Sequence, residues 1–136
     1  MAGAVVVLDS NVILRHLIGD HPELSARADA VFELIKDGRE FGLVPEAVFA
    51  ECIYVLEGPY SATRAAVAHW LSRLLSYRGL IGDHLPMLRE SLSVYANSNV
   101  SFVDALTLVT ARRNGFELVT FDERLKKLAS RLAESR

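Results

Sequence analysis

A short run of β-branched residues near the N-terminus, which stops abruptly at an acid, is the strongest constraint on the fold. Residues 4–8 read Ala-Val-Val-Val-Leu, and Asp9 follows directly. A continuous apolar run of this length is typical of a strand that is buried on both faces, as in parallel sheets covered by helices. We therefore expect a parallel sheet, with Asp9 at the carboxyl end of one strand.

Strand-like and helix-like segments alternate along the rest of the chain. Further strands are predicted at residues 40–44, 79–82 and 116–120. Helices are predicted at residues 11–18, 22–37, 45–56, 62–77, 84–97, 101–114 and 122–133. Strands separated by helices favour an α/β fold, here a three-layer α/β/α sandwich with a central, mostly parallel sheet. The length of 136 residues fits one domain over residues 1–136.

Composition excludes several classes of protein. Hydrophobic residues make up 51% and charged residues 24%, which is ordinary for a folded domain and argues against disorder. No stretch approaches the roughly 18 apolar residues of a membrane span, and no basic region marks a signal peptide, so we expect a cytoplasmic protein. The net charge of −2 means that any RNA binding must use a local patch or a bound cation. Cys52 is the single cysteine, and its apolar surroundings predict a buried, inert thiol.

Two aspartates each follow a predicted strand and precede a predicted helix. Asp9 ends the first strand, and Asp122 comes directly after Leu118-Val119-Thr120-Phe121. In open α/β sheets, ligands bind beyond the carboxyl ends of the strands, which is where both acids should lie. Asp is also among the best helix N-caps, so each residue has an ordinary structural explanation as well.

Two further acids interrupt helices that are otherwise apolar. Glu51 is the only charged residue in residues 47–56, and Asp104 is the only one in residues 100–111. A carboxylate inside a buried helix must be paired, protonated or bound to a metal ion. The ordinary alternatives are an exposed face or a salt bridge for Glu51, and a capping-box variant with Ser101 for Asp104.

If these elements flank the same end of the sheet, four carboxylates converge. Four anions in one pocket repel each other unless a cation neutralises them, and ligands that are all oxygen suit Mg²⁺ or Mn²⁺ rather than zinc. The four histidines show no metal-ligand spacing, and we expect them to be mostly exposed. They are His16, His21, His69 and His84.

The same residues, taken in order, resemble the PIN domain, and more narrowly the VapC-type toxins of prokaryotic toxin–antitoxin pairs. The resemblance spans residues 5 to about 125. The matching segments are Asp9-Ser10-Asn11-Val12-Ile13-Leu14, Glu51 in its apolar helix, Ser101-Phe102-Val103-Asp104-Ala105-Leu106, and Leu118-Val119-Thr120-Phe121-Asp122.

This resemblance implies a PIN-like α/β/α fold and an endoribonuclease that depends on magnesium or manganese. It also implies a homodimer, and an antitoxin protein whose tail occupies the active-site groove. Matched by position, the catalytic and metal-binding acids are Asp9, Glu51, Asp104 and Asp122, with Asn11 and Thr120 as polar supporting residues.

Basic and aromatic residues offer weaker signals for RNA binding. The basic candidates that could guide a phosphate backbone are Arg15, Arg112, Arg113, Arg124, Lys126 and Lys127, with ordinary solvated helix surface as the alternative. Trp70 and Tyr77 could stack on bases or line a dimer face, but packing in the core is favoured for both.

Two other functions fit parts of the pattern. A phosphotransferase could use Asp9 as a covalent nucleophile, but Asn11 stands where such enzymes place a second acid. A non-catalytic module could keep the fold and bind RNA or protein without cutting.

Overall fold

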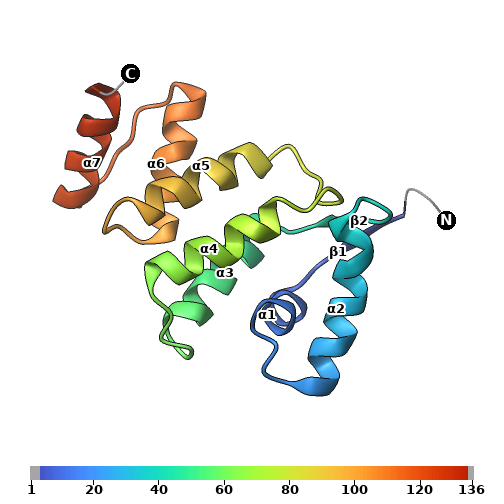
Figure 1. Cartoon of the computed structure of the whole chain (residues 1–136). Helices are drawn as coiled ribbons and strands as arrows, with labels where there is room; N and C mark the ends of the chain where they lie inside the picture. The colour runs from blue at the N-terminus through green and yellow to red at the C-terminus, as the bar shows by residue number, and fades with distance from the viewer. Residues whose placement is uncertain (1–3, 135–136) are drawn as a thin grey trace. The chain divides into compact units, whose positions relative to one another are not determined.

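The computed structural model describes residues 4–134 (Figure 1). The chain divides after Leu85 into two compact units. We refer to them as the N-terminal and C-terminal units and describe each by itself. In chain order the elements of the described residues are β1 (Val5–Val7), α1 (Ser10–Ile18), α2 (Pro22–Lys36), β2 (Phe41–Leu43), α3 (Glu46–Glu57), α4 (Arg64–Leu75), α5 (Leu85–Ala96), α6 (Phe102–Asn114) and α7 (Glu123–Glu134).

Parallel pairing of β1 and β2 forms the sheet of the N-terminal unit. Val6 lies opposite Gly42 in this register, and Gly42 also forms a parallel bridge with Leu80. The parallel sheet predicted from the sequence is therefore present. The strand predicted at 79–82 is reduced to that one bridge, because Gly82, at a φ of 136°, turns the chain away directly afterwards.

The prediction that the first strand is buried on both faces was wrong. Val5, Val6 and Val7 are 47%, 38% and 68% exposed, whereas Leu8, the next residue, is 3% exposed. Within the described residues β1 pairs only with β2, so its other edge and much of its side-chain surface stay open. The β-branched run correctly predicted the position of a strand, but it did not predict how much of the strand is exposed to solvent.

Four helices build the core of the N-terminal unit. In Figure 1, α1 lies against α2, and contacts between elements also join α1 to α3 and α3 to α4. Their fully buried side chains include Ile13, Phe32, Phe49, Leu56 and Leu71, one or more from each helix. Helical spacing of these apolar residues explains why the predicted helix positions agree closely with those observed.

The C-terminal unit is helical. Leu88 and Tyr95 on α5 and Leu108 on α6 are buried, and the rings of Tyr95 and Phe102 meet edge to face at 6.3 Å. Helix α7 contacts α6 and buries Leu128. No helix of the described residues is long and apolar enough to cross a membrane.

The strand predicted at 116–120 is not formed. This segment leaves α6 at Gly115, which has a φ of 66°, and pairs with no strand of the described residues. Phe116 and Val119 remain 67% and 80% exposed. The residues of this segment do favour a strand, but a strand forms only when a neighbouring strand supplies the backbone hydrogen bonds.

Glycine is required at position 79 because the backbone of Ile35 and Glu40 lies too close to leave room for a side chain. A Cβ at this position would collide with the carbonyl oxygens of Glu40 and Ile35, which cannot yield without moving the α2–β2 connection. We expect Gly79→Ala to lower the free energy of unfolding by about 1–3 kcal/mol, measured by urea denaturation. Gly58→Ala is the control, because the nearest atom to its added Cβ is the Tyr54 carbonyl oxygen at 3.3 Å. Equal losses in the two variants would contradict this account.

Candidate functional site

Asp9 lies between β1 and α1 and caps the helix. Its backbone is extended, and its Oδ1 accepts a hydrogen bond from the Val12 backbone N–H at 3.0 Å. The ordinary explanation for Asp9, an N-cap, is therefore correct. Its second carboxylate oxygen accepts no hydrogen bond from any described residue, so the cap orients the carboxylate and leaves one oxygen available.

Glu51 lies on the exposed face of α3. The buried face of that helix carries Phe49, Cys52 and Leu56, so the helix is covered on one side and not all round. Ser10, the first residue of α1, donates its hydroxyl hydrogen to Glu51 Oε2 at 2.8 Å. The exposed-face alternative for Glu51 is correct. Sequence reasoning missed its partner Ser10, which is separated from it by 41 residues.

The carboxylates of Asp9 and Glu51 both lie near the buried thiol of Cys52. Burial raises the pKa of the Cys52 thiol to about 12, and the negative charges of Glu51 and Asp9 add to the same shift. Both carboxylates therefore lie close enough to the thiol to act on it. Cys52 itself is fully buried and forms no disulfide, so the prediction of an inert thiol is confirmed.

Asp104 lies in the first turn of α6 and is half-buried. Its backbone N–H donates to Ser101 Oγ at 3.0 Å, which is one half of the capping box expected from the sequence. Within the described residues no donor contacts the Asp104 carboxylate. The cap therefore uses the backbone of this residue and leaves both carboxylate oxygens available.

Asp122 repeats at α7 the arrangement of Asp9 at α1. Its Oδ1 accepts hydrogen bonds from the backbone N–H groups of Arg124 and Leu125 at 2.9 and 3.3 Å. The Asp122 N–H in turn donates to Thr120 Oγ1 at 3.1 Å. Thr120 therefore contacts the backbone of Asp122 and not its carboxylate, and its supporting role stays a prediction.

The four acids divide between the two units. Asp9 and Glu51 belong to the N-terminal unit, and Asp104 and Asp122 to the C-terminal unit. In residues 4–134 there is no group of three or more His, Cys, Asp or Glu side chains that could hold one metal ion. Asp9 and Glu51 lie on segments that the Ser10–Glu51 hydrogen bond joins, and the convergence of all four acids stays a prediction. So does the supporting role of Asn11, which is exposed on α1.

Comparison with known proteins identifies the family. The family model for the PIN domain matches residues 6–131, a stretch that runs through both units. The chain belongs to the PIN domain family. This confirms the predicted α/β fold class and the family resemblance on which the site prediction rests.

A curated relative extends the comparison. The chain is 30% identical over 123 residues to a "VapC ribonuclease" of Aquifex aeolicus (strain VF5), and the match covers 90% of each chain. No solved structure gives a significant match.

Three of the four arginines singled out for RNA binding already have acidic partners in this PIN domain. Arg15 pairs with Asp20 at 3.2 Å. Arg113 and Arg112 pair with Glu90 at 3.0 and 4.0 Å. Arg124 makes no ion pair with any described residue. Sequence alone could not reveal the pairing of Arg112 and Arg113 with Glu90, because that acid lies more than twenty positions away.

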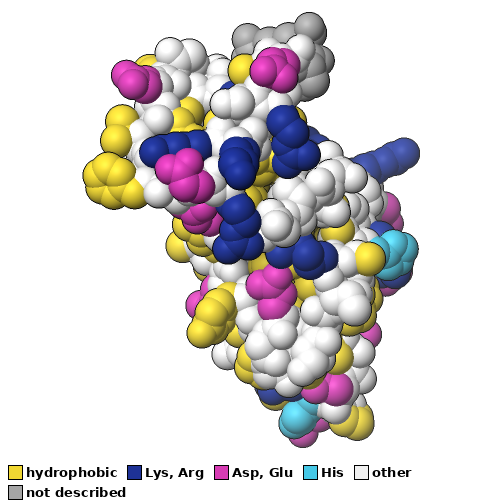
Figure 2. All heavy atoms as spheres, turned by 90° about the vertical axis from the view of Figure 1, so that its left-hand side faces the viewer, with side chains coloured by type: hydrophobic (Ala, Val, Ile, Leu, Met, Phe, Trp, Pro, Cys, Tyr) yellow, Lys and Arg dark blue, Asp and Glu magenta, His cyan; other side chains and the backbone are white. Residues whose placement is uncertain are grey.

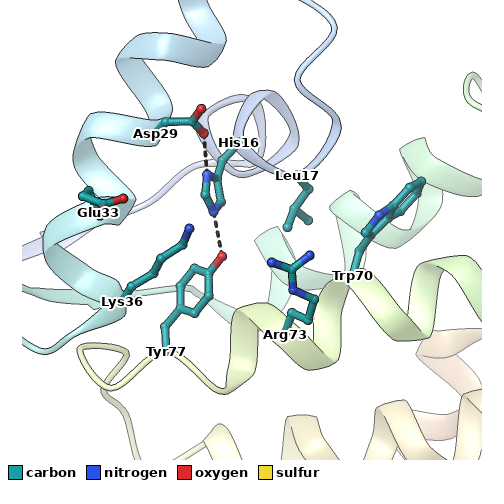
Figure 3. Close-up of a pocket in the computed structure, with 8 residues that line it drawn as sticks. All are labelled: His16, Leu17, Asp29, Glu33, Lys36, Trp70, Arg73 and Tyr77. Carbon is teal, nitrogen blue, oxygen red and sulfur yellow. Dashed lines mark hydrogen bonds and ion pairs between the residues drawn. The ribbon is translucent and has the colours of Figure 1, made fainter.

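A separate pocket of the PIN domain contains His16 (Figure 3). Its volume is about 290 Å³, and His16 lies between Asp29 on α2 and Tyr77 beyond the end of α4. Nδ1 of His16 lies 2.7 Å from Asp29 Oδ1, and Nε2 lies 2.7 Å from the Tyr77 hydroxyl. Since the Asp29 carboxylate accepts, the neutral ring donates from Nδ1 and accepts from Tyr77. The His16 ring also stacks on Phe32 at 4.3 Å.

The structure corrects the predictions for several ring side chains, in this pocket and outside it. The His16 side chain is only 7% exposed, and His84, which contacts the Val44 carbonyl oxygen through Nε2, is half-buried. The expectation of mostly exposed histidines holds for His21 and His69 alone. Trp70 and Tyr77 line the pocket and are partly exposed, instead of packing fully into the core. Polar hydrogen-bond partners explain why the rings of His16 and Tyr77 lie at its edge.

His16 should make stability depend on pH. Burial lowers its pKa in spite of the Asp29 carboxylate, so the unfolded chain takes up this proton at a higher pH than the folded chain. The free energy of unfolding should therefore fall as the pH drops below about 6.5, by at most about 1.4 kcal/mol per pH unit. Urea midpoints at pH 7.5, 6.5 and 5.5 should show this slope in the wild type and a smaller one in His16→Gln. His69→Gln, at an exposed histidine, is the control, and equal slopes in all three proteins would refute the assignment.

Proposed function

We propose that this PIN domain is a divalent-metal-dependent endoribonuclease that hydrolyses RNA phosphodiester bonds, and that it is the toxin of a toxin–antitoxin pair. The observation that carries this proposal is the complete, ordered set of acids in a chain whose family match covers residues 6–131. The name of the relative, a VapC ribonuclease with 30% identity, supports RNA as the substrate.

The chemistry of the acids fits a hard divalent cation. Asp9, Glu51, Asp104 and Asp122 would hold Mg²⁺ or Mn²⁺, which prefer carboxylate oxygens. Each of them keeps at least one oxygen without a donor among the described residues. A bound ion of this kind would lower the pKa of an attacking water and neutralise charge on the phosphate.

The neighbours of these acids hold them in place. Backbone N–H groups at the starts of α1 and α7 fix Asp9 and Asp122, and the Ser10 hydroxyl fixes Glu51. The positive end of each helix dipole stabilises the adjacent anion, which offsets part of the repulsion among clustered carboxylates. Residues that orient ligands in this way strongly affect metal affinity.

We further propose that residues 1–136 act as a single nuclease domain. The family match through both units supports this proposal. A partner antitoxin protein, a homodimer and a place in the cytoplasm follow from the family resemblance and stay predictions.

Asp9→Asn separates the chemical role of the acid from its role in folding. Asn caps a helix as well as Asp does, so the variant should fold normally. We expect RNA cleavage with Mn²⁺ or Mg²⁺ to fall more than about 100-fold, because losing a ligand should cost more than the 10- to 100-fold typical of a supporting residue. Cleavage is measured on labelled RNA, with EDTA as the metal-free reference. Asp83→Asn, at an exposed acid outside the predicted set, is the matched control.

The same assay distinguishes the alternatives. A wild-type protein that binds RNA but leaves it intact with either metal would favour the non-catalytic module. A phosphate group trapped on Asp9 would favour the phosphotransferase. Full activity of Asp9→Asn would contradict the proposed site.

Asp104→Asn tests whether the acids share a cation. Removing one charge from a cluster should raise the melting temperature of the metal-free protein, because less repulsion remains. The stabilisation by Mn²⁺, about 2.7 kcal/mol at a concentration 100 times the Kd, should shrink at the same time. The capping hydrogen bond uses the Asp104 N–H and survives the substitution. A lower metal-free melting temperature with an unchanged response to Mn²⁺ would exclude Asp104, and Asp83→Asn again serves as the control.

A further inference from the structure

Helix α7 carries a groove lined with cations on the side away from its buried residues. Leu125 and Leu128 face the interior of the C-terminal unit. A cavity of about 520 Å³ lies on the outer side. It is lined by Asn99, Arg124, Lys126, Lys127, Ser130 and Arg131. In Figure 2, which looks toward the side where α7 lies, Lys and Arg side chains gather on this face of the C-terminal unit.

The positive charge of this groove is largely unneutralised. None of the described residues that line it is an acid, and of its four cations only Lys126 has an acidic partner in the described part of the chain, Glu123 at 3.4 Å. Arg124, Lys127 and Arg131 make no ion pair with any described residue. The groove therefore collects free positive charge on a chain whose net charge is −2.

The spacing of the three free cations makes a stripe along the helix. Arg124, Lys127 and Arg131 stand at i, i+3 and i+7, which places them on one face of α7. With a rise of 1.5 Å per residue, the stripe is about 10 Å long. It begins two residues after Asp122, the acid that caps the same helix.

The lining of the groove selects among anionic partners. The described residues that line the groove are all polar or charged, and none of them offers a large apolar side chain on which an acidic protein could anchor. Arg, Lys, Ser and Asn are the side chains that usually contact phosphate and sugar oxygens. None of the described lining residues is an aromatic side chain on which a base could stack, so these contacts should not depend on base sequence.

The geometry points to the α7 groove as a site for the phosphate backbone of single-stranded RNA, which leads the strand toward Asp122. This inference rests on the proposed ribonuclease function, and it adds where the substrate strand runs. Arg131, Lys127 and Arg124 contact consecutive parts of one backbone, and Asn99 and Ser130 donate hydrogen bonds to it.

Lys127→Gln/Arg131→Gln tests the groove. Both side chains are exposed and lie away from Asp122, so the fold and the acids stay intact. The probe is a fluorescein-labelled 12-nucleotide RNA in EDTA, with the Kd followed by anisotropy from 50 to 200 mM salt. The slope of log Kd against log salt should decrease by about 1.4, at 0.7 per lost phosphate contact on a single strand. Two RNAs of unrelated sequence should lose the same fraction of their affinity.

Arg39→Gln/Arg78→Gln removes the same charge from the N-terminal unit and is the matched control. An unchanged slope in the groove variant, or an equal loss in the control, would overturn the inference. So would a polyglutamate peptide that binds the wild type more tightly than RNA and loses affinity in the groove variant, because the partner would then be an acidic protein.

Cleavage separates this inference from the proposed function. If the wild type cuts RNA and the groove variant binds and cuts equally well, the groove assignment fails while the nuclease stands. If the wild type never cuts but shows the groove-dependent salt slope, the nuclease fails while the groove stands. Where both hold, the groove variant should show a raised KM with little change in kcat.

Discussion

The start of a helix directly after an extended segment is the constraint on which the candidate site depends. Asp9 and Asp122 each use one carboxylate oxygen to satisfy backbone N–H groups that the helix itself leaves unpaired. The same hydrogen bonds prevent the carboxylate from rotating freely. Asp9 and Asp122 can therefore serve both the stability of the helix and the proposed binding of a cation. The hydrogen bond that caps the helix also fixes the orientation of the second carboxylate oxygen.

The fold could be predicted where its causes are local. Helix starts such as Ser101, with a hydroxyl cap, and helix ends such as Gly115, with a left-handed φ, are set within a few residues of sequence. Strands were predicted less well, because pairing depends on a distant neighbour. The segment 116–120 has the composition of a strand but no pairing partner among the described residues, and the Val5–Val7 run has one strand partner where full cover was expected.

The site shows the same division between local and distant causes. The caps at Asp9 and Asp122 could be predicted, since donor and acceptor are two or three residues apart. The Ser10–Glu51 hydrogen bond and the pairing of Arg113 with Glu90 could not, since each joins two helices. Arg131 was not among the residues singled out from the sequence, although its spacing from Arg124 is visible there, because an exposed basic helix face is usually only solvated surface.

The arrangement of charge along α7 explains how a slightly acidic chain can hold a polyanion. Screening in physiological salt limits the reach of a charge to about 8 Å, so an RNA backbone responds to the nearest side chains and not to the net charge. Asp122 and Glu123 stand at the start of α7 and Arg131 near its end, which is the order that the helix dipole favours. The stripe that begins at Arg124 runs from this acidic start toward the end of the helix, where Arg131 lies beyond the reach of the two acids and is free to attract phosphate.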